Sequence, residues 1–230
     1  MPQVPHPSRE WAARHLAGWT TPRLIGLVLL PVLLVVHWTG TAAAAGYGIM
    51  DLGTLPGGSY SSALAINDAG QVVGYSGLAS GDSHAFLWRA GAGMRDLGTL
   101  PGGRLSTAYS INDLGQVVGY STLASGDSHA FLWQAGTGMR DLGNLPNTAS
   151  RTSAARAIND VGRVVGESYT AFGDYQSHAF LWEEGAGMQD LGTLFDGDSS
   201  VAYGINSAGQ IVGQSSAAGA QTHAVLWTRQ

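Results

Sequence analysis

Beyond the first 48 residues, short apolar runs alternate with turn residues, and the apolar positions nowhere follow a helical period. Asn112-Asp113-Leu114-Gly115 is one such turn. Asn and Asp can bond their own backbone and glycine accepts a positive φ, so a tight hairpin is expected there. Ala135–Gly138 is a second glycine-rich turn. Four short β-strands per unit are therefore predicted, and in one stretch of the chain these are Thr107–Ile111, Gln116–Ser121, His129–Gln134 and Met139–Leu145.

The 45-residue unit Met94–Gly138 recurs with small edits before and after itself. The segment LASGDSHAFLW is unchanged between the first two copies, the third copy has extra residues in two connections, and the fourth is the most edited. Self-similarity at a fixed period indicates that each copy is one supersecondary unit. We place a repeat domain at residues 46–230, with copies at Ile49–Gly93, Met94–Gly138, Met139–Gly187 and Met188–Gln230.

The run Ala130-Phe131-Leu132-Trp133 is apolar on both of its alternating faces. Such a strand must be covered on both sides. Four-stranded units stacked around an axis supply that cover, and the period is close to the roughly 40–45 residues of a propeller blade. We therefore expect an all-β fold of four tandem four-stranded repeats, arranged as a four-bladed β-propeller.

The two ends of the repeat array favour a closed ring. Ile49–Leu55 resembles a fourth strand without a third-strand partner, and Ala224–Trp227 resembles a third strand without a fourth. Pairing the two removes both exposed edges, which otherwise invite aggregation. A β-solenoid is the alternative and would leave these strands far apart. A ring of eight blades from two chains is a third arrangement, so we expect a monomer or a ring-completing dimer.

Residues 1–45 differ in composition from the repeats. Three arginines in Met1–Arg23 precede the apolar run Leu24–Trp38 and the small residues TGTAAAAG, a layout typical of a secretory signal peptide cleaved after Ala44 or Ala45. An uncleaved anchor is the alternative, because the small residues would extend the run towards the ~20 residues of a membrane span. We favour cleavage, which implies a secreted protein, extracellular or periplasmic, with no stable membrane span.

Charge and cysteine content narrow the function classes. The formal net charge is −5, and all 11 basic residues are arginine. Residues 46–230 hold 8 Arg and 15 acids, a charge of −7, which argues against a nucleic-acid partner because nucleic acids require clustered basic residues. The absence of cysteine excludes disulfides and thiolate zinc sites.

The recurring pattern INDxGQVVGxS, SHAFLW and GMxDLGTLPGG resembles the HAF family of extracellular repeats. Its His-Ala-Phe occurs at His84–Phe86, His129–Phe131 and His178–Phe180, and the fourth copy departs from it with His223-Ala224-Val225. The resemblance covers residues 49–230. It implies a secreted bacterial protein and carries no catalytic residues over to this chain.

The repeated polar residues admit two interpretations. A ring would place His84, His129, His178 and His223 at equivalent positions, which could form a metal or anion site. We favour a structural role, in which each histidine bonds a neighbouring loop, because the four converge only if they lie on the innermost strands. The repeated Asp residues do not form a calcium loop, and the repeated tryptophans are expected in the core between blades. No cofactor is predicted.

Edits between copies fall in the connections at one end of the predicted blades, which is the expected mark of a binding face. We predict a non-catalytic binding or scaffold module that recognises a glycan or an envelope or extracellular protein there. The alternative is an extracytoplasmic hydrolase or lyase that uses carboxylates on the same face. Free drift of surface loops would give the same edits. The candidate residues, which are not shared between copies, are Arg104, Arg151, Tyr169, Phe172, Tyr175, Asp196 and Asp198.

Overall fold

The computed structural model describes residues 46–146, 148, 151–170 and 176–229. The chain divides into two compact units, Met1–Ile49 and Met50–Gln230. The predicted signal peptide at residues 1–45 lies outside the described residues. Among the residues that are described, no helix is long and apolar enough to span a membrane.

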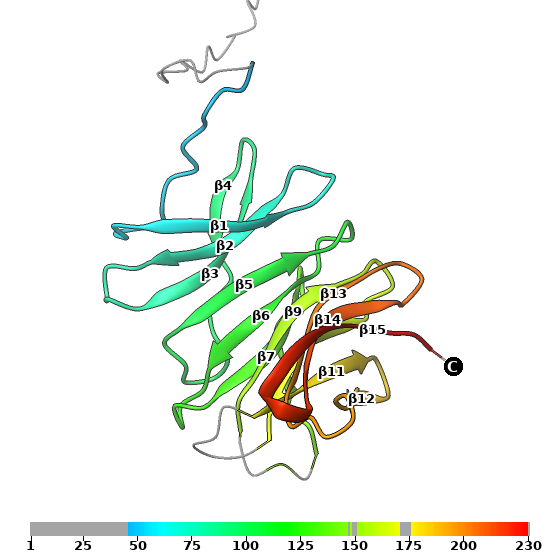
Figure 1. Ribbon diagram of the computed structural model, residues 1–230. Coiled ribbons are helices and arrows are strands. Elements are labelled where there is room, and N and C mark those ends of the chain that lie inside the picture. Colours follow the sequence, from blue (N-terminus) through cyan, green and yellow to red (C-terminus); the bar gives the residue numbers. More distant parts are fainter. Residues whose placement is uncertain (1–45, 147, 149–150, 171–175, 230) are drawn as a thin grey trace, which may run out of the picture. The chain divides into compact units, whose positions relative to one another are not determined.

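The second unit is all-β and consists of four antiparallel sheets that follow one another along the chain (Figure 1). Three sheets have four strands and the last has three, with consecutive strands as neighbours in each. The first sheet consists of β1 (Ser61–Ile66), β2 (Val72–Gly77), β3 (Ser83–Arg89) and β4 (Gly93–Asp96). The second consists of β5 (Ser106–Ile111), β6 (Val117–Thr122), β7 (Ser128–Gln134) and β8 (Gly138–Gly143). The last two are β9 (Ser153–Ile158), β10 (Val164–Tyr169), β11 (Ser177–Glu183), β12 (Gly187–Asp190), and β13 (Ser200–Ile205), β14 (Ile211–Ala217), β15 (Gln221–Trp227), with a short 3₁₀ turn η1 (Ala218–Ala220) before β15. The tandem four-strand repeats predicted from the sequence are thereby confirmed for the first three sheets.

The predicted hairpin turn after β5 forms as its residues dictate. The Asn112 side-chain oxygen accepts a hydrogen bond from the Gln116 backbone N–H at 2.9 Å, and its amide donates to the Gln116 side chain at 2.7 Å. Gly115 takes a φ of 74°, which glycine adopts without strain. The turn therefore sets the register of β5 against β6, with Ile111 opposite Val117.

The first strand of every sheet contains a β-bulge at the same repeat position. Pairing skips one residue in β1, β5, β9 and β13, and the skipped residues are Leu64, Tyr109, Arg156 and Tyr203. A bulge bends the strand and re-aims the side chain of the extra residue. Opposite the bulge in β6, a Cβ on Gly119 would overlap the Thr107 carbonyl oxygen, so only glycine fits there.

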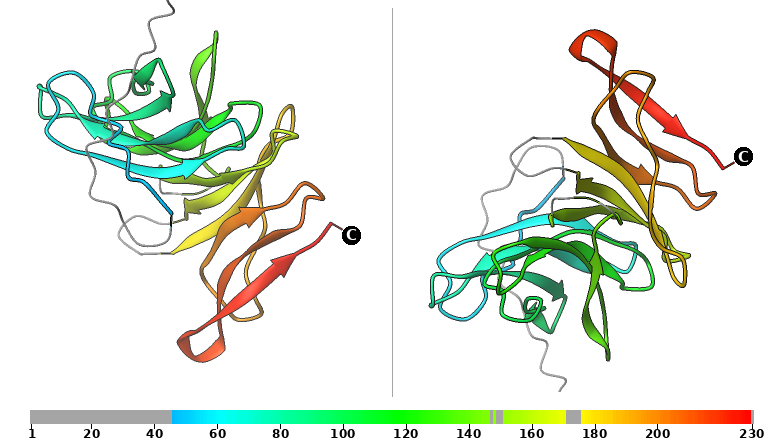
Figure 2. Two further views of the ribbon diagram at one scale, coloured as in Figure 1. Left: turned by 90° about the horizontal axis from the view of Figure 1, so that it is seen from above. Right: turned by 90° about the horizontal axis from the view of Figure 1, so that it is seen from below.

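Each sheet packs against the next through a recurring joint. The face that contacts the following sheet is here named the leading face, and the opposite one the trailing face. In the joint between the first two sheets, the leading face supplies Val73, Ala85 and Leu87, and the trailing face supplies Ala108, Ile111, Phe131 and Trp133. Equivalent residues form the next two joints. The apolar runs such as Ala130–Trp133 are thus covered on both faces, as predicted, and Figure 2 shows the sheets following one another in chain order.

Neighbouring sheets are also linked through their hairpin turns. The side-chain amide of Asn67 donates to the Asn112 carbonyl, Asn112 to Asn159, and Asn159 to Asn206, each at 3.0 Å. The four turns line a shared hollow of about 240 Å³. First strands of neighbouring sheets lie against one another, β1 with β5, β5 with β9 and β9 with β13. The first strand of each sheet is therefore the strand that contacts the first strands of the neighbouring sheets.

Ring closure stays a prediction. Ala224–Trp227 lies in β15 as expected, but in the described part of the chain β15 pairs with β14 alone, and Gly46–Thr54 belongs to no strand. The named strand pairs are all antiparallel and formed by consecutive strands, whereas a β-solenoid pairs strands of successive coils.

Candidate functional site

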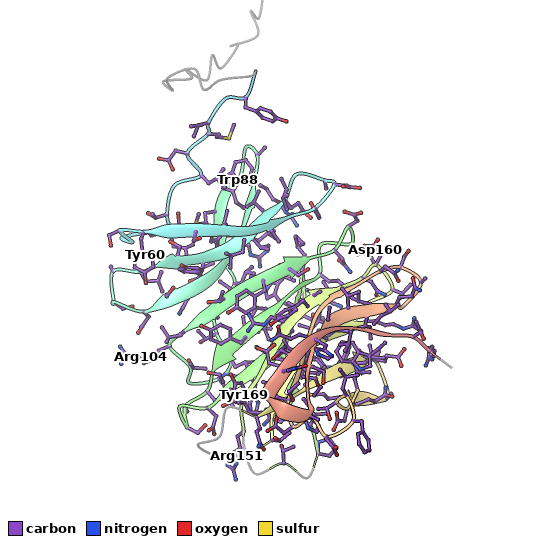
Figure 3. The ribbon with its side chains drawn as sticks, in the orientation of Figure 1. Tyr60, Trp88, Arg104, Arg151, Asp160 and Tyr169 are labelled. Carbon is purple, nitrogen blue, oxygen red and sulfur yellow. The ribbon has the colours of Figure 1, made fainter. Side chains whose placement is uncertain are left out.

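The described parts of the connections between sheets and of the loops after each second strand lie at one end of the sheets. Figure 3 shows Arg104 and Arg151 at that end and Asp160, which lies in a hairpin turn, at the opposite end. Arg104 Nε donates to the Asp82 carboxylate of the preceding sheet at 2.8 Å. The hydrogen bonds from Arg104 and from Ser80 hold the pKa of Asp82 below its ordinary value. Arg104 thus bridges two neighbouring loops rather than extending alone into solvent.

The candidates of the fourth copy lie in the connection that precedes β13. Asp196 has a φ of 57°, a left-handed conformation that short polar residues tolerate. The Asp198 carboxylate accepts hydrogen bonds from Ser216 at 2.9 Å and from Gln176 at 3.4 Å. Within the described residues, no three or more His, Cys, Asp or Glu side chains gather in a way that could hold a metal ion. The Asp198 carboxylate thus bonds one side chain at the end of β14 and one just before β11, and Phe195 beside Asp196 is exposed.

The third copy carries the other candidates. Phe172 and Tyr175 lie outside the described residues, and Arg151 is exposed. Tyr169 ends β10 and borders a cleft of about 200 Å³ between the second and third sheets (Figure 3). We name this feature the tyrosine cleft. Its functional side chains are Tyr109, Tyr120, Ser128, Thr152, Arg156, Glu167 and Tyr169.

An ion pair forms the floor of the tyrosine cleft. Arg156 is the bulged residue of β9, and its Nε and Nη2 donate to both oxygens of Glu167 on β10. The Glu167 side chain is 6% exposed and the Arg156 side chain 33% exposed. The hydrogen bonds to Glu167 raise the pKa of Arg156 against the opposing effect of its burial. Arg156 is therefore a fixed cation whose carboxylate partner is almost fully buried.

Aromatic rings form the wall of the cleft. The Arg156 guanidinium lies 4.6 Å from the centre of the Tyr109 ring, within the range of a cation–π contact. Tyr109, the bulged residue of β5, packs against Tyr120 with ring centres 5.8 Å apart. Burial raises the pKa of Tyr109, so its hydroxyl stays protonated and able to donate. The cleft thus joins flat apolar surfaces to hydroxyl, guanidinium and carboxylate groups.

This combination suits recognition of a small polar group with an apolar face. Tyrosine rings offer stacking surface with a polar tip, and guanidinium groups bind paired oxygens in a fixed geometry. Glu167 is the carboxylate in the cleft, and it is held by Arg156. The arrangement thus offers apolar and polar contact points at several side chains.

Apart from Tyr169, sequence reasoning missed the residues of the tyrosine cleft. Arg156 and Glu167 lie inside strands, whereas the edits between copies that were predicted to mark a binding face lie in the connections. The signal was available in the comparison of copies. The position of Arg156 holds Leu64, Tyr109 and Tyr203 in the other copies, while the surrounding residues are nearly constant. At the Glu167 position the other copies have Tyr75, Tyr120 and Gln214.

The repeated histidines lie on the third strand of each sheet, not on the first strands that contact one another between sheets. His84, His129 and His178 each bond through Nδ1 to an aspartate on the fourth strand of the same sheet, at 2.8 to 2.9 Å. The partners are Asp96, Asp141 and Asp190, which also accept hydrogen bonds from glycine N–H groups two residues later. The structure therefore places the four histidines on separate sheets, and three of them bind an aspartate of their own sheet. In the described structure they do not come together in one metal site.

Comparison with known proteins gives one family match. No curated protein matches the chain. The family model for "Protein of unknown function (DUF3466)" matches residues 104–223, slightly more than half of the sequence. The matched segment contains the tyrosine cleft and three of the four sheets in whole or in large part. The narrower resemblance to HAF repeats stays a prediction. The chain belongs to the family of proteins of unknown function DUF3466.

Proposed function

We propose that the chain is a secreted or periplasmic, non-catalytic binding module that recognises a glycan at the end of the sheets bearing Tyr169. The observation that carries this proposal is the tyrosine cleft, with its two packed tyrosine rings and its Arg156–Glu167 pair. A protein of the cell envelope or the exterior is the other ligand class to be screened.

Three properties of the cleft support a glycan. Sugar rings present apolar C–H faces beside hydroxyl groups, and tyrosine offers a matching apolar face and polar tip. The hydroxyls of Ser128 and Thr152 and the charged pair supply hydrogen-bonding groups around a volume of about 200 Å³, room for one small group. The rest of a longer ligand would extend over the neighbouring loops, where Arg151 is exposed.

The finer architecture is part of the same proposal. The four sheets are blades of a β-propeller ring, which is closed by pairing of the segment around Ile49–Leu55 with β15, either within one chain or between two chains. Support comes from the recurring joint between sheets and from first strands that lie against one another. The proposed leader at residues 1–45 would deliver this domain across the membrane.

A glycan array and an extract of envelope proteins, probed with the purified protein, test the proposal. The expected result is selective binding to one glycan class, with an affinity that falls at least tenfold in Tyr169→Ala. Tyr203→Ala is the matched control, because Tyr203 holds the bulge position of the fourth sheet and lies outside the cleft. Equal losses in both variants, or binding to no glycan, would contradict recognition of a glycan at the cleft.

A further inference from the structure

Two faces of the described sheets lack the cover that their equivalents have. On the leading face of the last sheet, Val212 is 51% and Leu226 59% exposed, whereas Leu87, the counterpart of Leu226 in the first sheet, is 1% exposed. On the trailing face of the first sheet, Ile66 is 67% exposed, against 7% for Ile111 in the second. One half of the recurring joint is therefore open at each end of the array. The two halves are complementary because the same repeat positions pack against one another in the internal joints.

The open leading face is also hollowed. A cavity of about 370 Å³ lies over β13, β14 and β15 and is lined by Ile205, Val212 and Leu226 among others. In the first two internal joints the following sheet occupies the equivalent place and contributes an alanine, an isoleucine, a phenylalanine and a tryptophan, and in the third joint Val225 holds the place of the phenylalanine. The first sheet carries the matching residues on its trailing face: Ala63 and Ile66 are exposed, while Phe86 and Trp88 pack against Leu52 and Leu55 of the same chain. The occupant that fits this hollow is the first sheet of this same sequence.

The two open ends of the array also match in the register in which their backbones could pair. β15 has an unpaired outer edge among the described strands, and Gly48–Asp51 aligns with Gly93–Asp96, which forms β4 on the outer edge of β3. In β3 and β4, Leu87 lies opposite Arg95 and Trp88 opposite Met94. The same register sets Leu226 opposite Met50 and Trp227 opposite Ile49. Ile49 and Met50 are exposed and belong to no strand in the described chain.

Two side chains lack the partners that their equivalents have. His223 occupies the place of His84, but the described structure gives it a hydrogen bond only to Gln221, at 3.3 Å. Asp51 occupies the place of Asp96 and accepts a hydrogen bond from Gly53, as Asp96 does from Gly98. What Asp51 lacks is the histidine that each equivalent aspartate binds. Joining the two open edges would bring His223 and Asp51 together in the fourth such pair.

We propose that a second copy of this chain occupies the open leading face, with Gly48–Asp51 of one copy added to β15 of the other and Asp51 bound to His223. The inference rests on the blade arrangement proposed above. Two such joints close a ring of eight sheets, related by a twofold axis. A head-to-tail interface gives a closed ring when the rotation that relates neighbouring copies is a whole fraction of 360°, here half a turn. The arrangement removes both open edges, which would otherwise invite further pairing.

The described contacts favour a second copy over closure within one chain. First strands of adjacent sheets pack closely in all three internal joints, whereas no comparable packing joins β13 to β1 within the described residues. Val212, Leu226 and Ile66 are accordingly exposed together in the one chain. The same interface, already present three times, would be used a fourth time between molecules.

Cysteine cross-linking distinguishes the two modes of closure, because the chain has no cysteine of its own. Met50→Cys and Leu226→Cys replace exposed side chains, so the fold should tolerate both. Opposite residues of an antiparallel pair lie about 5.5 Å apart at Cα, within the range that a disulfide spans. The two single variants are purified separately, mixed, oxidised and run on a non-reducing gel. We expect a cross-linked dimer from the mixture and none from either variant alone.

Each other outcome overturns a defined part of the proposal. If Met50→Cys and Leu226→Cys cross-link only when combined in one chain, as a monomer, the ring closes within the chain and the second copy is refuted. If no cross-link forms in either format, the pairing of Gly48–Asp51 with β15 is itself wrong. Light scattering of the native protein should give twice the chain mass, and a mass of one chain or of a long polymer contradicts the two-copy ring. Glycan binding is measured independently at Tyr169.

The His223–Asp51 pair has a matched control within the chain. Asp51→Asn should raise the dissociation constant of the dimer at least tenfold, measured by dilution in analytical ultracentrifugation. Asp96→Asn breaks the equivalent internal pair with His84 and should lower the melting temperature without changing the dissociation constant. Equal effects of the two variants on dimerisation would refute the role of Asp51 in the joint.

Discussion

Replacing the ion pair of the tyrosine cleft by the tyrosines of the preceding copy separates its energetic role from its binding role. The second sheet holds Tyr109 and Tyr120 where the third holds Arg156 and Glu167. In Arg156→Tyr, the Glu167 carboxylate stays buried without its cation, since its side chain is only 6% exposed. Breaking a buried pair in this way costs about 3 kcal/mol or slightly more.

The reverse variant should be milder. In Glu167→Tyr, the guanidinium of Arg156 remains, but a third of this side chain is exposed and water can solvate it. We expect a loss of about 1 kcal/mol, because exposed charges lose little when their partners are removed. The double variant Arg156→Tyr/Glu167→Tyr has no buried charge and should regain stability to within about 1 kcal/mol of the native protein.

Urea unfolding of the four proteins measures these differences, and thermal melts should show shifts of about 2–4 °C per kcal/mol for a chain of this length. The order of stability expected is native and double variant, then Glu167→Tyr, then Arg156→Tyr. Additive losses in the double variant would refute the reasoning, since they would mean that the two side chains act independently rather than as a pair.

Three further predictions test the fold. Gly119→Ala should prevent folding or lower the melting temperature by more than about 10 °C, measured by circular dichroism, because its Cβ would overlap the Thr107 carbonyl oxygen beside the bulge. Asn112→Ala removes the amide that donates to the next hairpin turn and the oxygen that accepts a hydrogen bond within its own turn. The free energy of unfolding in urea should fall by about 2 kcal/mol, and an unchanged value would contradict this role. Burial raises the pKa of Asp141, but hydrogen bonds from His129 and from the Gly143 N–H lower it by more, so the pKa lies below its ordinary value of 3.8. The stabilisation by this carboxylate is therefore present above pH 3.8 and is lost as the pH falls through the lowered pKa. The difference in unfolding free energy between the native protein and Asp141→Asn should accordingly shrink in that acid range. A difference that is constant with pH would contradict the lowered pKa.

The strands and their burial on both faces were predictable because the repeated residues report local chemistry. Turn residues such as Asn112 and Gly115 fix the hairpins, and two-sided apolar runs such as Ala130–Trp133 require cover on both faces. Each strand predicted in the second copy begins and ends within about two residues of the observed strand, the scatter expected of element boundaries.

The tyrosine cleft was not predictable in the same way. A bulge inserts one residue into a strand, so the alternation of faces on which the sequence pattern depends breaks at that residue. Arg156 and Tyr109 are the inserted residues, and their contact joins two sheets whose packing the pattern does not specify. The bond from Arg104 to Asp82 likewise joins two copies, and no local pattern marks it.

The central proposal is that the residues shared between copies build the sheets, while the unshared residues of the tyrosine cleft bind a glycan. Calorimetric titration of the native protein and of Arg156→Tyr/Glu167→Tyr with the glycan selected on the array tests it most directly. The account predicts that the double variant keeps its cooperative unfolding transition and loses at least tenfold in affinity. Unchanged affinity in the folded double variant would contradict it.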